Sequence, residues 1–276
     1  MLKTYFFIPA NRHDFIANID SIDADFFILD FEESVAIANK QESIDAFPPI
    51  VIKQNYYARP YFGNTNTIQT HFFEELIARG FRKFVLPKID SILQLQIIAD
   101  ACGFNLEEIS CILLVESPKC LLNLQQIIEN SPLTIEGVAL GSHDFAMAMH
   151  MEHTLPNLQF ARQQVLCIAR AYSIECIDIA SMDIQASNIF IDECSQSVSL
   201  GFESKFTIHP KQLDAIKKIQ WYTNEQVSEA YSIYSHIEKL DYNTFSVVSA
   251  NGKLYEKPHI ERFKKIIDWS RKYGNK

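Results

Sequence analysis

The 276-residue chain is poor in glycine, with 8 residues, where average usage near ~7% would give roughly 19. It therefore has few spare turns and no flexible glycine-rich linker. It contains no GxGxxG or Walker-type loop, which excludes the commonest nucleotide-cradle motifs. It also lacks a basic run, and its 34 acidic and 25 basic side chains give a formal charge of −9. This balance argues against nucleic acid or an anionic membrane as a partner.

Long hydrophobic runs and paired cysteines are absent as well. The longest apolar stretches, such as residues 111–115, are far shorter than the ~20 residues that a membrane helix needs. The first residues lack a signal peptide's apolar core, because polar residues begin as early as Asn11. The six cysteines form no CxxC pair and no zinc-type spacing with histidine. We therefore expect a cytoplasmic protein, with Cys111 and Cys176, which lie inside apolar runs, reduced and buried.

Short apolar or β-branched runs recur along the chain, and each is followed by a stretch with helical spacing. Their apolar residues fall at consecutive positions, which is typical of parallel strands buried on both faces. The candidate strands are 4–8, 26–30, 57–61, 84–86, 111–115, 137–140, 175–179 and 206–208. Eight strand–helix units in about 250 residues predict an α/β fold of the (β/α)8 TIM-barrel type. A doubly wound open sheet is the alternative, because periodicity alone does not show closure.

The sequence after about residue 215 has a different pattern. Residues 211–240 have the spacing of one or two helices, and residues 260–271 that of an amphipathic helix. Between them, Asn251-Gly252 lies within alternating residues, which is a type I′ hairpin signal. We predict a barrel over residues 1–215 and C-terminal helices with a hairpin lid over residues 216–276. Because this extension is too small for a core of its own, we expect it to pack on the barrel or on a neighbouring subunit.

Polar side chains follow every predicted strand at its carboxyl end. In chain order they are Asn11 and Arg12; Asp30, Glu32 and Glu33; Arg59; Lys88; Glu116; Ser142, His143 and Asp144; Asp178 and Asp183; and His209. In a barrel these ends converge on one face, where such enzymes carry their chemistry. Unpaired charges are costly to bury, so this set implies mutual pairing, a metal or an anionic ligand.

Three of these residues suggest a specific chemistry. Glu116 and Asp144 end sequence-adjacent strands and could supply oxygen ligands to Mg²⁺, with water and substrate completing the coordination. A loop salt bridge, or an N-cap role for Asp144, is the alternative. Arg59 lies in an otherwise apolar strand and is suited to a bidentate grip on a carboxylate or a forming enolate. A salt bridge to Asp30 or Glu32 is an equally good interpretation of Arg59.

An ordered series of strings resembles a known family. The strings are FFIPANR, ILDFEESV followed by Lys40, Arg59, FVLPK, LLVES, VALGSHDFA and LGFESKFTIHPKQ. Together they resemble the HpcH/HpaI aldolase and citrate lyase β-subunit family, in particular its acyl-CoA lyase branch. The resemblance covers residue 4 to about 215, with a weaker match at 252–258. It implies a (β/α)8 barrel, commonly a homo-oligomer, that binds Mg²⁺ (or Mn²⁺) and cleaves or forms a carbon–carbon bond beside a carboxylate or thioester.

The resemblance also implies roles for single residues. Glu116 and Asp144 match the family's metal ligands, with Asp30 behind them. Arg59 matches the arginine that binds the substrate carboxylate. With the proton donor described next, Arg59 and Asp30 are the residues that we expect to be catalytic.

Two further regions match the family with departures. Asn11 and Arg12 lie in the loop that often meets the phosphates of coenzyme A. The string GKLYEKP resembles a lid motif whose aspartate serves as proton donor, and Glu256 stands at that position. Tyr61 replaces the asparagine expected two residues after Arg59. These changes leave the metal ligands unaltered but bear on the specificity for acyl-CoA.

We therefore expect Mg²⁺-dependent retro-aldol or retro-Claisen cleavage, or the reverse condensation, of a small molecule. The substrate would be a 3-hydroxy acid or its coenzyme A thioester. One alternative is a 2-oxo acid aldolase that uses pyruvate and an aldehyde without coenzyme A. The other alternative is a non-catalytic subunit that binds a metabolite or a partner protein.

Overall fold

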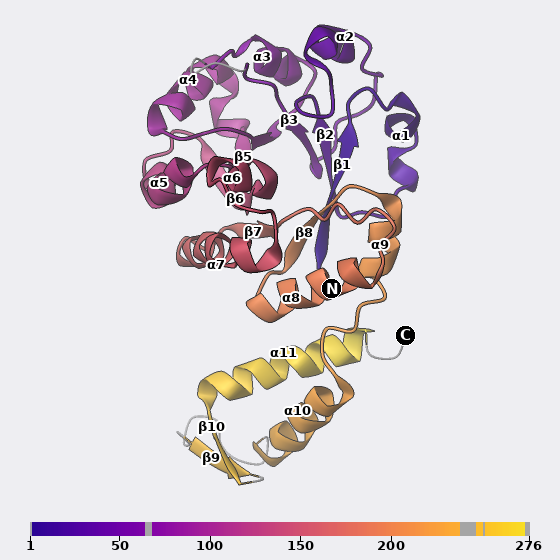
Figure 1. Cartoon of the computed structure of the whole chain (residues 1–276), viewed down its shortest axis with the longest axis vertical. Helices are drawn as coiled ribbons and strands as arrows, with labels where there is room; N and C mark the ends of the chain where they lie inside the picture. Colours follow the sequence, from indigo (N-terminus) through magenta and orange to yellow (C-terminus); the bar gives the residue numbers. More distant parts are fainter. Residues whose placement is uncertain (1, 64–67, 238–246, 251, 274–276) are drawn as a thin grey trace. The chain divides into compact units, whose positions relative to one another are not determined.

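The computed structural model describes residues 2–63, 68–237, 247–250 and 252–273, and these contain a closed barrel of eight parallel strands (Figure 1). The strands are β1 (Lys3–Pro9), β2 (Phe26–Asp30), β3 (Tyr56–Arg59), β4 (Lys83–Leu86), β5 (Ser110–Val115), β6 (Thr134–Leu140), β7 (Glu175–Asp178) and β8 (Ser204–Thr207). Each strand pairs with the next along the chain, and β1 pairs with β8 to close the ring. The predicted TIM barrel is confirmed, and the open-sheet alternative is wrong.

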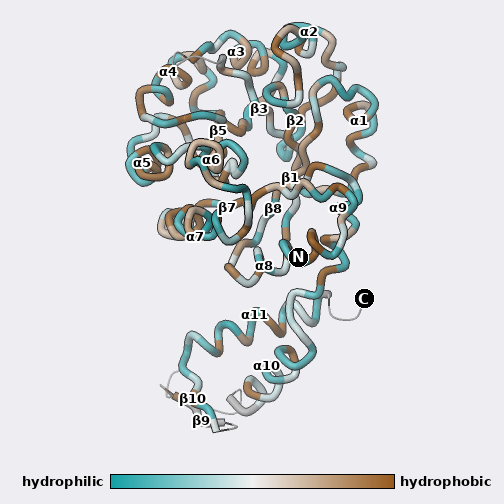
Figure 2. Tube along the Cα trace, in the orientation of Figure 1, coloured by the Kyte–Doolittle hydropathy of each residue, from teal (hydrophilic) through white to brown (hydrophobic). Residues whose placement is uncertain are grey.

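Helices follow the strands and surround the barrel (Figure 1). They are α1 (His13–Ala17), α2 (Lys40–Asp45), α3 (His71–Ala78), α4 (Ile92–Cys102), α5 (Pro118–Glu129), α6 (Ser142–Ala148), α7 (Leu155–Ala171), α8 (Asn188–Leu200) and α9 (Pro210–Ile216), with short 3-10 turns at Ile19–Ser21, Ile37–Asn39 and Gly103–Glu108. Hydrophilic and hydrophobic residues alternate along them (Figure 2). This pattern gives each helix an apolar side to bury against the strands.

Local signals in the sequence explain where the helices begin. The hydroxyl of Ser117 accepts a hydrogen bond from the backbone of Cys120, and Pro118 occupies the first turn of α5. At α9, His209 and Gln212 form a reciprocal capping box ahead of Pro210. Such caps satisfy amide groups that have no partner inside the helix.

The strands are buried on both faces, as the consecutive apolar residues predicted. The inward side chains fill the barrel and form one cluster, made of Tyr5, Ile28, Tyr57, Val85, Ile112, Leu114, Ala139, Ile177 and Phe206. A larger cluster lies between strands and helices. Since the interior is packed with side chains, the barrel is no pore, and ligands must bind at an end of the strands.

Asp178 at the end of β7 lies on the outer face of the barrel, away from the expected cluster of polar residues. Its carboxylate accepts hydrogen bonds from Nε and Nη2 of Arg162 at 2.9 and 2.6 Å, and from the hydroxyl of Ser197. The ammonium of Lys205 is 3.9 Å away. Burial opposes ionisation of Asp178, but these two cations outweigh it and lower the pKa. This buried ion cluster joins α7 and α8 to the strands.

The residues after Lys217 form a separate compact unit. It contains α10 (Asn224–Ile237), the antiparallel pair β9 (Val247–Ala250) and β10 (Lys253–Glu256), and α11 (Lys257–Tyr273). Asn251 of the predicted turn lies outside the described residues, as do residues 238–246. The unit has a small apolar cluster around Ile233, Tyr255 and Ile267, which the sequence analysis did not expect. Its role as a lid stays a prediction.

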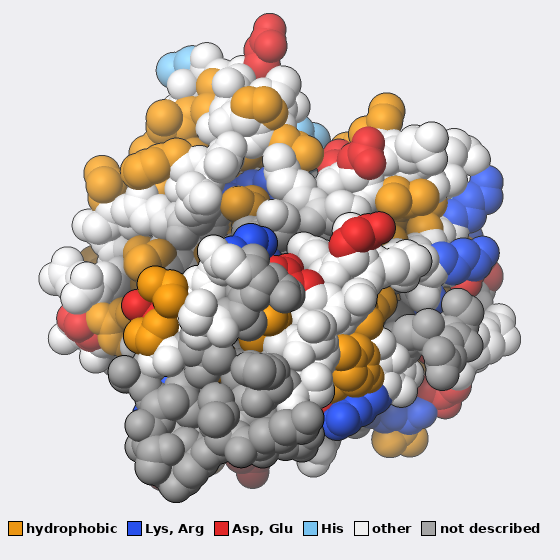
Figure 3. Space-filling view, turned by 90° about the horizontal axis from the view of Figure 1, so that it is seen from below, with side chains coloured by type: hydrophobic (Ala, Val, Ile, Leu, Met, Phe, Trp, Pro, Cys, Tyr) orange, Lys and Arg blue, Asp and Glu red, His pale blue; other side chains and the backbone are white. Residues whose placement is uncertain are grey.

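The surface carries charges of both signs. On the face shown in Figure 3, acidic, basic and apolar side chains are interspersed. Within the described residues, no helix combines the length and the apolar character that crossing a membrane requires.

Candidate functional site

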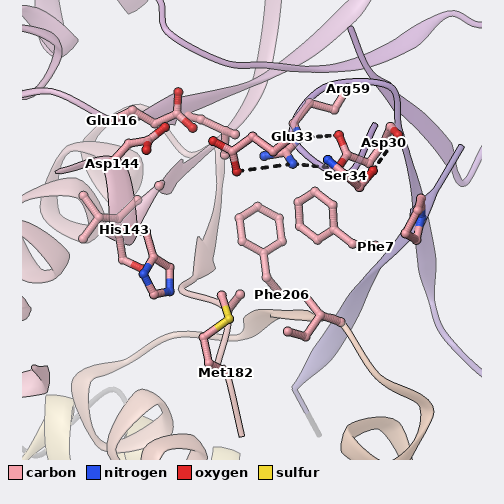
Figure 4. Close-up of a pocket in the computed structure, with 17 residues that line it drawn as sticks. Phe7, Asp30, Glu33, Ser34, Arg59, Glu116, His143, Asp144, Met182 and Phe206 are labelled. Carbon is pink, nitrogen blue, oxygen red and sulfur yellow. Dashed lines mark hydrogen bonds and ion pairs between the residues drawn. The ribbon is translucent and has the colours of Figure 1, made fainter. Parts of the chain in front are cut away.

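A cavity of about 370 Å³ opens at the carboxyl end of the barrel strands (Figure 4). The alternation of side chains along a strand explains which residues line it, because residues two positions apart point to the same face. Ile28, Tyr57 and Leu114 point into the barrel. The residues two positions further along the chain are Asp30, Arg59 and Glu116, and all three line the cavity.

Asp30 and Arg59 form a buried ion pair that is joined by two hydrogen bonds. They are in-register neighbours on β2 and β3, and Nε and Nη2 of Arg59 donate to the two carboxylate oxygens at 2.7 and 2.8 Å. The backbone amides of Glu32 and Ser34 also donate to Asp30. Burial opposes the charge of Asp30, but Arg59 and these donors outweigh it and lower the pKa. Asp30 is thus held ionised, which confirms the salt-bridge interpretation of Arg59.

The rest of the Arg59 guanidinium faces further acids. Nη1 lies 3.5 Å from the Glu32 carboxylate, and Nη2 lies 3.8 Å from that of Glu33. Its flat face lies over the ring of Phe7, 5.0 Å from the centroid. Although burial opposes the charge of Arg59, Asp30 and, less strongly, these two glutamates raise its pKa. Nη1 therefore keeps the weakest contact and is the donor most available to a ligand.

Glu116 is buried at the end of β5 and is held by backbone rather than by a cation. Its Oε2 accepts a hydrogen bond of 2.7 Å from the amide of Lys88. Lys88 has a positive φ of 60°, unusual for a residue with a side chain, and its Nζ donates to Glu32 at 2.7 Å. Burial raises the pKa of Glu116 to about 8, and the charges of Glu32 and Asp144 add to the effect against that of Arg59. The charge of the carboxylate is therefore only partly compensated by Arg59.

Gly141 makes room for Glu116. A Cβ atom at position 141 would lie 2.3 Å from Cγ of Glu116, a distance that no real contact tolerates. The residue that precedes α6 must therefore lack a side chain if Glu116 is to keep its place.

Asp144 lies in the first turn of α6 and lines the same cavity. The helix has no side-chain cap, so the N-cap alternative for Asp144 is wrong. Figure 4 shows Asp144 near Glu116, with Glu33 between Asp144 and Arg59. Burial raises the pKa of Glu33; Arg59 opposes this effect, and the charges of Glu32 and Asp144 add to it. Negative charge is thus concentrated on this side of the cavity.

The residues present fit a hard divalent cation. Mg²⁺ typically takes one or two protein carboxylates and completes its octahedron with water and substrate oxygens. Glu116 and Asp144 offer such a pair, and the raised pKa of Glu116 marks charge that a cation would neutralise. Within the described residues, no group of three or more His, Cys, Asp or Glu side chains is arranged to bind a metal alone.

Three of the expected residues do not line this cavity. Arg12 is exposed, and its Nε and Nη2 donate to Asp14 at 2.9 and 2.7 Å. Asn11 precedes it in the same exposed loop. Glu256 is an exposed residue of β10 in the C-terminal unit. Their roles stay predictions.

Sequence reasoning overlooked the apolar half of the cavity. Phe7, Met182, Phe206 and Ile208 line it, together with Leu114 and Leu140. Phe7 and Phe206 could have been predicted to line the cavity, because they lie near the carboxyl ends of β1 and β8. Apolar residues of a strand were instead assigned to the core.

The sequence matches the HpcH/HpaI aldolase/citrate lyase family over residues 3–210. The chain belongs to this family. The resemblance found in the sequence is thereby confirmed. The citrate lyase subunit beta of Leuconostoc mesenteroides subsp. cremoris is 23% identical over 279 residues, covering 96% of this chain and 92% of that protein. The mitochondrial citramalyl-CoA lyase of Homo sapiens is 23% identical, covering 86% of this chain and 78% of that protein.

Solved structures share the fold. The CitE protein of Mycobacterium tuberculosis, in complex with magnesium, acetoacetate and coenzyme A, superposes with a TM-score of 0.81 at 20% identity, covering 99% of this chain and 98% of that chain. RipC from Yersinia pestis gives a TM-score of 0.66 at 24% identity, over 82% and 98% of the two chains.

We expect Gly141→Ala to weaken Mg²⁺ binding by roughly 10–100-fold, the usual cost of disturbing a group that positions a metal ligand. The added methyl would displace Glu116. Calorimetric titration with Mg²⁺ measures the change. Gly103→Ala is the control: its added Cβ would meet no neighbouring atom, and the backbone strain that a φ of 54° imposes on alanine falls on a residue that does not line the cavity. Equal affinities in the two variants would contradict a ligand role for Glu116.

Proposed function

We propose that the protein is a Mg²⁺-dependent (or Mn²⁺-dependent) carbon–carbon lyase. It cleaves a 3-hydroxy acid, or its coenzyme A thioester, into two carbonyl fragments or runs the reverse condensation. One observation carries the proposal: Glu116 and Asp144 share a cavity with Arg59, and the charge of the buried Glu116 is only partly compensated by Arg59. Membership of the family supports it, as do relatives named as citrate lyase β-subunits and citramalyl-CoA lyase.

Glu116 and Asp144 would hold the cation, which when bound would act as a Lewis acid on the oxygens of the substrate. Cleavage breaks the bond between C2 and C3: the 3-hydroxyl loses its proton to solvent and becomes a carbonyl oxygen, and the electron pair of the broken bond moves to an enolate. Arg59 stabilises the negative charge that grows on the enolate oxygen, using the Nη1 that Asp30 does not engage. Asp30 holds the guanidinium in place. Asp30 is therefore a positioning residue.

The enolate carbon must finally gain a proton, and we propose Glu256 as the donor. The support is the resemblance of GKLYEKP to the family's lid motif. Glu256→Gln should abolish turnover while leaving Mg²⁺ affinity unchanged, because only proton delivery is lost. Turnover assays and calorimetry on the same preparation measure both. Full activity in this variant would assign the proton donor elsewhere.

Glu116→Gln should abolish metal-dependent cleavage without lowering the stability of the metal-free protein. The amide replaces a carboxyl group whose ionisation is opposed by burial, so the folded state no longer bears the cost of raising the pKa of this group to about 8. Acetyl-CoA release from hydroxyacyl-CoA substrates measures activity, with EDTA-treated protein as the reference. Thermal unfolding without metal measures stability. Unchanged activity would overturn the proposed metal site.

We propose that the thioester form is the substrate and that Asn11 and Arg12 meet the phosphates of coenzyme A. A phosphate would have to compete with Asp14 for the guanidinium of Arg12. Arg12→Gln should therefore raise KM for the thioester, by roughly tenfold for one lost charge-assisted contact, and leave kcat unchanged. The KM of the free hydroxy acid is the control. An equal effect on both substrates, or on neither, would favour the aldolase that works without coenzyme A.

We also propose a homo-oligomer in the cytoplasm. The oligomer rests on the family resemblance, and native mass measurement tests it. The cytoplasmic location is supported by the six cysteines, all of them free and five of them buried, as expected in a reducing compartment.

A further inference from the structure

The apolar half of the cavity has no part in the proposed reaction. The rings of Phe7 and Phe206 meet edge-on, with centroids 5.0 Å apart. Figure 4 shows them side by side beneath the Glu33–Arg59 pair, with Met182 beyond Phe206. Ile208 and Ala180 also line this side. We call Phe7, Met182, Phe206 and Ile208 the apolar wall.

The charged half offers no uncommitted lysine or arginine to a second carboxylate; beside the acids and Arg59, its described lining has the hydroxyls of Ser34 and Ser142 and the imidazole of His143. Among the described residues that line the cavity, Arg59 is the single Lys or Arg, against four acids. Asp30 already engages two of its N–H groups. Two lysines lie nearby without lining the cavity: Lys88 donates to Glu32, and Lys40 donates to the carbonyls of Phe31 and Glu32.

A bound divalent cation would not attract a second carboxylate at the far end of the substrate. Its charge would be neutralised by Glu116 and Asp144, and it would bind the first carboxylate of the substrate and the oxygen beside it. A further carboxylate elsewhere on the substrate would then face the apolar wall or the remaining acids, Asp30 and Glu33, with His143 as the one other titratable side chain of the described lining besides Arg59. Both environments disfavour an anion, the first by desolvation and the second by repulsion.

We propose that the apolar wall selects substrates whose 2-oxo acid fragment carries an alkyl side chain rather than a second carboxylate. This inference rests on the proposed function, because it places the 2-oxo acid at the Glu116–Asp144 pair. Phe7, Met182 and Phe206 are the specificity-determining residues. They act by burying the alkyl group.

Calorimetric titration of the Mg²⁺-loaded full chain with small 2-oxo acids tests the preference. We expect 2-oxobutyrate to bind about fourfold more tightly than pyruvate, the gain from one buried methylene. Freshly dissolved oxaloacetate, with its second carboxylate, should bind on the order of tenfold more weakly than pyruvate or worse. Oxaloacetate binding as tightly as 2-oxobutyrate, or more tightly, would overturn the proposal.

Oxalate binding distinguishes a failure of this proposal from a failure of the proposed lyase function. It chelates the cation but has no side chain to reach the wall. If oxalate fails to bind in the presence of Mg²⁺, the metal site itself is wrong. If oxalate binds and oxaloacetate is preferred to 2-oxobutyrate, only the wall is wrong.

A charge placed on the wall should reverse the preference. Met182 is 57% exposed, so Met182→Lys can be accommodated and would present an ammonium to the cavity. We expect this variant to bind oxaloacetate more tightly than 2-oxobutyrate. The matched control is Met149→Lys, a 47% exposed methionine that does not line the cavity, and it should keep the original order. If Met182→Lys binds Mg²⁺ and oxalate normally but keeps the original order too, Met182 does not determine specificity.

Discussion

The ion pair between Asp30 and Arg59 is the interaction on which the arrangement of the pocket depends. It arises from strand register, because the two residues are direct neighbours on β2 and β3. Its two parallel hydrogen bonds fix the guanidinium in orientation as well as in position. Since Asp30 takes up the charge of Arg59, the acids opposite keep an excess of negative charge. A bound divalent cation would offset that excess.

The buried charges of the pocket lower the free energy of unfolding, and the hydrophobic core of the barrel around it provides the stability. Glu116 is 7% exposed, and its pKa of about 8 shows that its charge is opposed by its surroundings. Apart from Leu114, Leu140 and Phe206, the packed barrel interior and the helix-covered outer face lie outside the pocket, as does the cluster of Asp178, Arg162 and Lys205. Concentrating unfavourable interactions at one end of a large hydrophobic core is a common division between stability and function.

Much of this arrangement could be predicted from the sequence. The apolar runs gave the strands, and the carboxyl ends of parallel strands meet on one face, which brought Asp30, Arg59, Glu116 and Asp144 together. The failure at Asp178 has a physical cause. A strand buried on both faces shows no alternation between polar and apolar residues, so the sequence does not reveal which side chains point inward. Ile177 points into the barrel, and its neighbour Asp178 therefore points out.

Other features depend on geometry that no local pattern encodes. The pairing of Arg12 with Asp14 removes a free cation from the first loop, although both residues were visible in the sequence. The contact between Gly141 and Glu116 joins residues 25 positions apart on neighbouring elements. The apolar wall was overlooked because its members have the composition of core residues and differ from them only in lining a cavity.

The left-handed backbone at Lys88 limits which amino acids this position can accept. Glycine would relieve the torsional cost but would forfeit the ammonium that reaches Glu32. Asparagine tolerates the same torsion yet is too short and uncharged. Every residue but proline would keep the amide that bonds Glu116. Lysine therefore occupies this position despite the torsional cost of its backbone, because its amide binds Glu116 and its ammonium binds Glu32.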